Sequence, residues 1–199
     1  FFEKIKSIPN PSFILDEELF IQNMEILAAL QKEIGIHVLC ALKGFSMWEV
    51  FPLMMGYLGG GTASSLNEAR LIHDEMGKKA HSCFVVYNRE EFKEVQGLSS
   101  HITFNSMSQF ERFKKELRKD VNYGLRINPE FSNVDFIKYN PCAPGSRFGV
   151  TFDELPTIFP EEITGLHFHT LCESSSGNFK DVLDVIESKF GNILHRMKW

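Results

Sequence analysis

Short apolar runs recur along the sequence about every twenty residues, and stretches with helical character separate them. The runs begin near residues 37, 59, 82, 102, 123 and 165. Parallel strands need a long crossover between them, usually a helix, so this spacing predicts a parallel sheet with helical crossovers. Because the repetition shows no reversal, it favours a (β/α) barrel over a doubly wound sheet.

The helical stretches have both the periodicity and the end signals of amphipathic helices. Residues 17–34 repeat apolar side chains at steps of three or four, and Gly35 follows as a residue suited to ending a helix. A second helix is expected from about Ser65, because Glu68 three residues later completes the capping-box pattern. Further amphipathic stretches lie at 89–96, 106–119 and 178–190. The chain is therefore expected to alternate strand and helix throughout.

The predicted barrel is incomplete. A closed barrel of this type has eight strands and about 250 residues, whereas the chain has 199 residues and six strand-like runs. Residues 197–199 suggest the beginning of another strand. We therefore expect an α/β fold, a TIM-type parallel (β/α) barrel that is incomplete in this chain, formed by residues 17–199 and preceded by a separate segment, 1–16. The chain is expected to be part of a longer protein.

The composition argues against some classes of partner and is typical of an ordinary globular protein. Hydrophobic residues make up 43% of the chain and charged residues 24%, which is typical of a domain with a normal core. The net charge of -5 argues against nucleic acid or an anionic membrane as partner. No apolar stretch approaches the length of a membrane span. The four cysteines, Cys40, Cys83, Cys142 and Cys172, form no CxxC pair, which favours reduced thiols in a cytoplasmic protein.

Lys43 follows the apolar run at 37–42 and precedes Gly44. If this run is a barrel strand, Lys43 lies at its carboxyl end, where barrel enzymes place their active sites. Partial burial lowers the pKa of a lysine and frees its amine for Schiff-base chemistry. The alternative is a lysine that only extends its ammonium group into solvent at a strand end.

His167 and His169 flank Phe168 in the last apolar run. Strand alternation would place both imidazoles on one face, which must be the barrel interior because the other face packs on helices. Two histidines there can hold a metal ion, as in barrel hydrolases, or a flat imidazole can stack on a cofactor ring. A hydrogen-bonded pair of core histidines is the third possibility. The other strand ends carry no carboxylate, which weakens the metal hypothesis.

Arg126 alternates with Leu125 and Ile127, so it is expected to face the interior of the barrel. A buried arginine must be paired. Its guanidinium suits a carboxylate, a phosphate or a phenolic oxygen of a ligand, and a salt bridge to Glu68 inside the barrel is the alternative.

Several sequence stretches, taken together, resemble the alanine-racemase-like, or fold type III, pyridoxal-phosphate decarboxylases. This family includes the ornithine and diaminopimelate decarboxylases, and the resemblance is strongest to the carboxynorspermidine and carboxyspermidine decarboxylases of polyamine biosynthesis. The stretches that carry it run in family order: Ala41–Gly44, Thr62–Glu68, Leu125–Pro129, Tyr139–Gly149 and Gly165–Glu173.

The resemblance implies a role for each candidate residue. Lys43 would form the covalent imine with pyridoxal 5'-phosphate, and His169 would stack on its pyridine ring. Arg126 and Glu68 would belong to the polar network around the cofactor. Catalytic and cofactor-binding roles would also fall to Cys172, near the phosphate. Arg147, in Ser-Arg-Phe-Gly, and Glu173 would lie further out, toward the substrate.

The resemblance also implies parts of the family's enzymes that these residues do not supply. Relatives carry a phosphate-binding glycine loop, an acid that pairs with the pyridine nitrogen, and a C-terminal β-domain that pairs with a segment like 1–16. They form homodimers, so a cytoplasmic homodimeric carboxy-lyase without a metal is expected. Two other hypotheses remain at this point: a barrel that binds pyridoxal phosphate without catalysis, and a metal-dependent hydrolase that uses His167 and His169.

Overall fold

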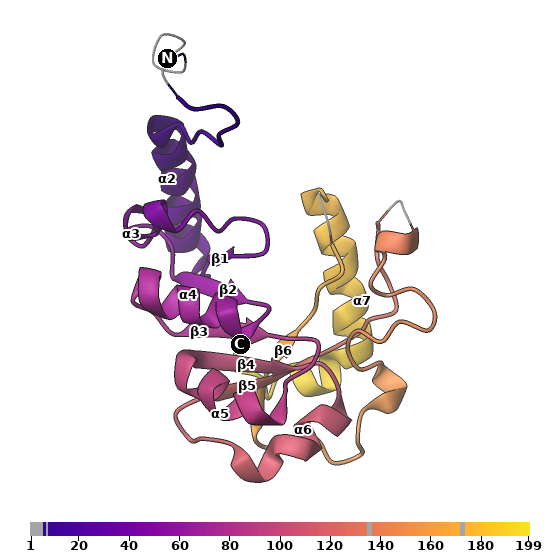
Figure 1. The fold of residues 1–199 in the computed structure, drawn as a ribbon. Coiled ribbons are helices and arrows are strands. Elements are labelled where there is room, and N and C mark those ends of the chain that lie inside the picture. Colours follow the sequence, from indigo (N-terminus) through magenta and orange to yellow (C-terminus); the bar gives the residue numbers. More distant parts are fainter. Residues whose placement is uncertain (1–5, 7, 135–136, 172–173) are drawn as a thin grey trace.

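The computed structural model describes residues 6, 8–134, 137–171 and 174–199, and it contains one parallel sheet. Its six strands follow one another in chain order, each hydrogen-bonded to the next (Figure 1). They are β1 (Leu39–Ala41), β2 (Gly60–Ala63), β3 (Ala80–Cys83), β4 (Ser99–Phe104), β5 (Asn122–Arg126) and β6 (Ile163–His167). All five pairings are parallel. The predicted α/β class and the predicted number and order of strands are confirmed.

Helices connect the strands and cover the outer face of the sheet. They are α2 (Glu17–Ile34), α3 (Phe51–Met54), α4 (Leu66–Met76), α5 (Arg89–Leu98), α6 (Met107–Phe113) and α7 (Ser176–Leu194). Short 3-10 turns occupy Trp48–Val50, Lys114–Glu116, Ile137–Tyr139 and Phe152–Glu154. Helix α4 packs on β2 and β3, and both α5 and α6 pack on β4. Fully buried phenylalanines fill the layer between helices and sheet, among them Phe92, Phe104, Phe110 and Phe113.

The predicted ends of the first two long helices are confirmed. Gly35 ends α2 in the left-handed conformation, with φ at 70°, where a residue without Cβ is favoured. The Ser65 hydroxyl accepts a hydrogen bond from the Glu68 backbone N–H at 3.3 Å and so caps α4. The Glu68 carboxylate returns to the chain just before the helix and accepts from the Ser64 N–H at 2.6 Å. Local sequence signals therefore fix both ends.

Two predicted strands are shifted along the chain. The apolar runs predicted strands that begin near residues 82 and 165, but β3 covers Ala80–Cys83 and β6 covers Ile163–His167. In the first case the buried Tyr87 hydroxyl turns back onto the strand ends, 3.0 Å from the carbonyl oxygens of Ser82 and Thr103. The alternation of apolar side chains continues past the point where backbone pairing stops. The sequence pattern therefore predicts that a strand is present but not where it ends.

A seventh element begins to extend the sheet beside β6. The Lys198 N–H donates to the Thr164 carbonyl at 2.7 Å, and the Leu166 N–H donates to the Trp199 carbonyl at 3.0 Å. The Trp199 indole lies so close to Gly124 and Gly165 that a Cβ on either glycine would overlap its ring. These two glycines are register partners in β5 and β6, so they identify the face of the sheet that forms the barrel interior.

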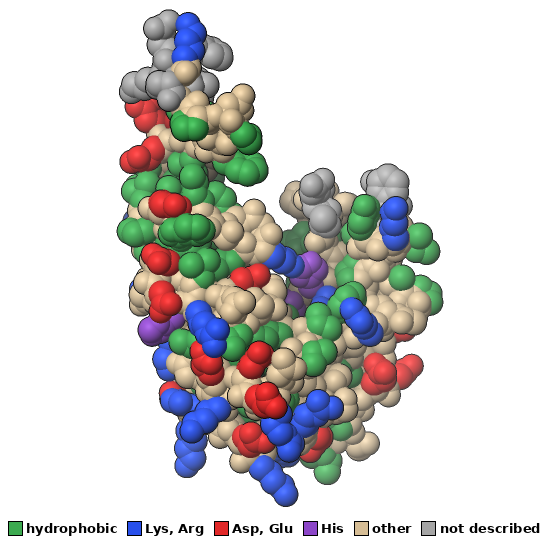
Figure 2. All heavy atoms as spheres, viewed as in Figure 1, with side chains coloured by type: hydrophobic (Ala, Val, Ile, Leu, Met, Phe, Trp, Pro, Cys, Tyr) green, Lys and Arg blue, Asp and Glu red, His purple; other side chains and the backbone are tan. Residues whose placement is uncertain are grey.

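The carboxyl ends of the strands border a hollow. Figure 2 shows it between the part of the molecule that carries α2 and the part that carries α7, with basic and histidine side chains at its floor. None of the described helices combines the length and the apolar character that crossing a membrane requires.

Candidate functional site

Arg126 and His167 end two adjacent strands and face the barrel interior. They are register partners in β5 and β6. Along each strand they lie two positions beyond the pair of Gly124 and Gly165. Side chains two positions apart on a strand share a face, so Arg126 lies on the Gly124 face and His167 on the Gly165 face. The interior position that the sequence predicted for both residues agrees with this register.

Lys43 lies beyond the end of β1 rather than within a strand. The chain turns there, because the N–H groups of Gly44 and Phe45 both donate to the Ala41 carbonyl, at 2.9 and 3.1 Å. The lysine side chain is exposed. Its positive charge still acts on the two histidines near the barrel interior, since it contributes to lowering the pKa values of His167 and His169. Lys43 therefore shares one end of the sheet with the other candidate residues.

Both histidines are held in their neutral form at ordinary pH. Burial lowers the pKa of His167 to about 3, and the charges of Arg126, His169 and Lys43 add to this effect. The pKa of His169 is also lowered, first by burial and then by Lys43 and Arg126. The two rings lie 6.4 Å apart, and His169 is the more exposed. A neutral imidazole open to the hollow can stack on a flat ligand.

Arg126 is 9% exposed, and burial lowers the pKa of its guanidinium. Within the described residues the guanidinium has no hydrogen bond and no ion pair. The guanidinium lies over the ring of Phe148, whose centroid is 4.8 Å from Cζ. Among the described residues Arg126 forms no salt bridge to Glu68, the alternative that the sequence left open, and the Glu68 carboxylate instead accepts from the Ser64 N–H. A buried cation without a partner is suited to an anionic group of a ligand.

One further candidate residue, Arg147, lies at the edge of this group. Arg147 is exposed, and its Cζ lies 5.4 Å from the centroid of the Phe148 ring. Cys172 and Glu173 lie outside the described residues. Of the described cysteines, Cys40, Cys83 and Cys142 are all free thiols, as the sequence predicted.

The structure adds residues to the site that the sequence did not predict. Burial raises the pKa of the Cys83 thiol at the end of β3, while Arg126 and Lys43 act in the opposite direction. Two buried polar atoms, His167 Nε2 and Thr170 Oγ1, have no hydrogen-bond partner among the described residues. Cys83 was missed because the predicted strand ran past it, although it ends a strand as Lys43 and Arg126 do.

Comparison with known proteins finds relatives of this chain. No model of a known protein family matches it. Carboxyaminopropylagmatine decarboxylase of Synechocystis sp. is 43% identical over 197 residues, which is 98% of this chain and 51% of the relative. Carboxynorspermidine/carboxyspermidine decarboxylase of Campylobacter jejuni is 39% identical over 199 residues, which is the whole of this chain and 51% of the relative. The chain is homologous to carboxynorspermidine-type decarboxylases.

The fold agrees with these decarboxylases. A crystal structure of carboxynorspermidine decarboxylase from Campylobacter jejuni, complexed with norspermidine, superposes with a TM-score of 0.88 at 36% identity. The match covers 96% of this chain and 49% of that enzyme. The chain thus spans about half the length of the curated decarboxylases it matches. The predicted incomplete (β/α) barrel agrees with the fold of this relative.

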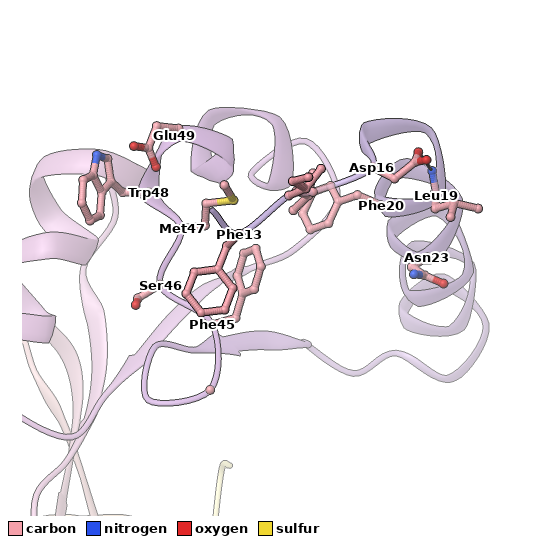
Figure 3. A pocket seen from close by; sticks show the side chains of 13 residues that line it. Phe13, Asp16, Leu19, Phe20, Asn23, Phe45, Ser46, Met47, Trp48 and Glu49 are labelled. Atoms are coloured by element: carbon pink, nitrogen blue, oxygen red, sulfur yellow. Dashed lines mark hydrogen bonds between the residues drawn. The ribbon is translucent and has the colours of Figure 1, made fainter. Parts of the chain in front are cut away.

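A second hollow, distinct from the one in Figure 2, is largely apolar and has a volume of about 770 Å³. It adjoins the turn that carries Lys43 (Figure 3). Its walls come from the segment before α2, from α2 itself and from residues 44–49. They include Phe13, Phe20, Phe45 and Met47, and the rings of Phe20 and Phe45 stack at 5.9 Å. These side chains make the walls largely apolar.

The described residues offer no metal site. No group of three or more His, Cys, Asp or Glu side chains in this part of the chain lies close enough to hold a metal ion. His167 and His169 therefore lack a third ligand among the described residues.

Proposed function

We propose that this chain is the barrel part of a pyridoxal-phosphate-dependent decarboxylase that acts on a carboxylated polyamine. The observation that carries the proposal is the group of Lys43, Arg126 and His169 at one end of a parallel sheet. Homology to decarboxylases named for carboxynorspermidine, carboxyspermidine and carboxyaminopropylagmatine supports the substrate class. The substrate would be a polyamine with a carboxylate next to an amine, and the products would be the polyamine and carbon dioxide.

The residues of the site fit an anionic, planar cofactor. Arg126 is a nearly buried guanidinium without an anionic partner among the described residues. His167 Nε2 and Thr170 Oγ1 are buried polar atoms without described partners, and buried polar groups are normally satisfied. Two positive charges and neutral imidazoles suit a ligand that carries a phosphate and a phenolic oxygen.

Each residue then has a distinct task. Lys43 would hold the cofactor covalently through its amine, and His169 would lie against the flat ring with its uncharged imidazole. Arg126 would bind an anionic oxygen, and Cys172 would contribute near the phosphate. Glu68 would belong to the surrounding polar network, with Arg147 and Glu173 toward the substrate. When bound, pyridoxal phosphate supplies a ring that accepts the electron pair left behind as carbon dioxide departs.

We further propose that the whole protein is a cytoplasmic homodimer in which residues 1–16 pair with a β-domain outside this chain. The exposed apolar side chains of α2, which include Leu19, Ile26 and Leu30, support further packing on this helix. Light scattering on the whole protein tests the dimer, and an active monomer would contradict it.

The first experiment is intact-mass spectrometry of the whole protein after incubation with pyridoxal phosphate and reduction with borohydride, followed by peptide mapping. We expect a single pyridoxyl adduct on Lys43 and none in Lys43→Ala. Lys78→Ala is a matched control, because this exposed lysine lies far along the chain on the turn after α4. An adduct that persists in Lys43→Ala would overturn the assignment.

A second measurement separates decarboxylation from the two other hypotheses. Carbon dioxide release should be measured with carboxynorspermidine, carboxyspermidine and carboxyaminopropylagmatine as substrates. A lysine adduct without release from any of them would indicate a protein that binds the cofactor without catalysis. A protein with tightly bound metal and no adduct would instead favour a hydrolase that uses His167 and His169.

A further inference from the structure

A buried amide at the end of β4 holds the loop that lies over Arg126. Asn105 directly follows β4 and is 8% exposed. Its Nδ2 donates to the Arg147 carbonyl at 2.9 Å, and its Oδ1 accepts from the Gly149 N–H at 3.2 Å. One side chain therefore fixes the backbone on both sides of the intervening Phe148.

The same loop is attached to β5 by the backbone. The Val150 N–H donates to the Arg126 carbonyl at 2.9 Å, and the Asn128 N–H donates to the Val150 carbonyl at 2.8 Å. Gly149 adopts a φ of 81°, and a Cβ there would lie 2.8 Å from the carbonyl carbon of Ile127. The loop therefore lies so close to the backbone just after β5 that a side chain at position 149 would clash with it.

This double attachment places the Phe148 ring against the guanidinium of Arg126. The distance from Arg126 Cζ to the ring centroid is 4.8 Å, within the range of cation–π attraction. Among the described residues, no hydrogen bond or ion pair holds the guanidinium in place, so its contact with the ring is what orients it. A free arginine side chain has many rotamers, and holding it in one of them before binding reduces the entropy lost on binding.

We propose that Asn105 is a positioning residue that acts through Phe148 to orient Arg126 for the anionic group it binds. The inference rests on the proposed function, because it takes the cofactor as the ligand of Arg126. It assigns a role to Asn105 and Phe148 that each performs through a neighbouring residue. Loss of either should weaken ligand binding at Arg126 while the guanidinium itself is retained.

The test is the dissociation constant of pyridoxal phosphate in the whole protein, from titration of the visible absorbance of the lysine-bound cofactor. We expect Asn105→Ala to raise this constant about tenfold, since it removes two hydrogen bonds that each contribute modestly. Phe148→Leu, which keeps apolar bulk without the ring face, should raise it in the same direction. In the background of Arg126→Gln, Asn105→Ala should change the constant by less than about twofold.

Gln96→Ala provides the matched control for a merely structural effect. Gln96 is 3% exposed, and its amide also holds a loop by two backbone hydrogen bonds, to the Glu116 carbonyl and from the Arg118 N–H. That loop lies at the opposite end of the sheet, before β5. Gln96→Ala should lower the melting temperature as Asn105→Ala does, but it should leave the dissociation constant unchanged.

The outcomes separate this inference from the proposed function. An unchanged constant in Asn105→Ala beside a raised constant in Arg126→Gln overturns the inference alone. So does an equal rise in Gln96→Ala and Asn105→Ala, which would indicate general destabilisation. A whole protein that attaches no cofactor to Lys43 overturns the proposed function, and the inference falls with it.

Discussion

Arg126 and His167 are direct neighbours across the last pairing of the sheet, on the interior face of the barrel. Their proximity explains part of why the pKa of His167 lies at about 3, with burial as the larger cause. The pair presents one fixed positive charge and one neutral imidazole at adjacent strand ends. That combination suits an anionic ligand, because the neutral imidazole adds no second positive charge that the ligand would have to neutralise.

Arg126→Gln is expected to raise the pKa of His167, because a repelling positive charge is removed. The pKa should stay below the ordinary value of 6.5, since burial remains. Nuclear magnetic resonance titration of the imidazole protons measures the change. Arg70→Gln serves as control, because Arg70 pairs with Glu94 on the surface and should leave His167 unaffected. An unchanged His167 pKa in Arg126→Gln would contradict the electrostatic coupling.

Gly149→Ala should destabilise the protein more than Gly145→Ala. Both glycines have positive φ, at 81° and 77°, which costs any other residue about 1 kcal/mol. Only at Gly149 would the added Cβ meet backbone atoms, those of Ile127 and Asn128, whereas nothing lies within 4 Å at Gly145. We expect a loss of roughly 2–4 kcal/mol against about 1 kcal/mol. Urea unfolding of both variants measures the difference, and equal losses would show that the loop can move off β5.

The fold was predictable from the sequence because its signals are local. Apolar runs, helix periodicity and end signals such as Gly35 and Ser65 depend on a few neighbouring residues, and they predicted the order of the elements. Strand ends were less predictable. They depend on where the neighbouring strand offers hydrogen bonds, and for this reason β3 and β6 begin two residues before the predicted runs.

The residues of the candidate site also differ in whether local sequence signals could predict them. Lys43, Arg126 and His169 were predictable as polar residues at the ends of apolar runs, with the family resemblance adding their roles. The support from Asn105 was not predictable, because its amide binds residues 42 and 44 positions away. Such contacts follow from how the loop folds back on the sheet, and no periodicity in the sequence encodes them.

Tyr87→Phe is expected to lower stability by about 1–3 kcal/mol, although it keeps the aromatic ring. The buried hydroxyl lies 3.0 Å from the carbonyls of Ser82 and Thr103, and it accepts from the Phe84 N–H at 3.2 Å. Its removal leaves these backbone groups without that partner in a dry environment. Tyr57→Phe is the comparison, because no hydrogen bond joins the Tyr57 hydroxyl to another described residue. Similar melting temperatures for the two variants would contradict the role of the hydroxyl in joining β3 and β4.

Acid should destabilise the protein through His81 at the other end of the sheet. His81 and His101 are register partners in β3 and β4, and their rings stack at 3.9 Å. Burial, followed by the charges of His101 and His37, lowers the pKa of His81 from its ordinary value of 6.5 to about 4. Stability from the neutral ring is therefore fully present above pH 6.5 and is lost as the pH falls toward 4.

His81 contributes roughly 1–2 kcal/mol to the loss between pH 7 and pH 5, because the unfolded chain takes up a proton there that the folded chain excludes, and His167, whose pKa is also low, adds to the loss. Urea unfolding at the two pH values measures it. His81→Phe keeps a stacking ring that cannot titrate, so the difference between the two pH values should shrink. His195→Gln, at an exposed position just after α7, should retain the full difference. If His81→Phe loses as much stability on acidification as the unchanged protein, another group is responsible for the acid sensitivity.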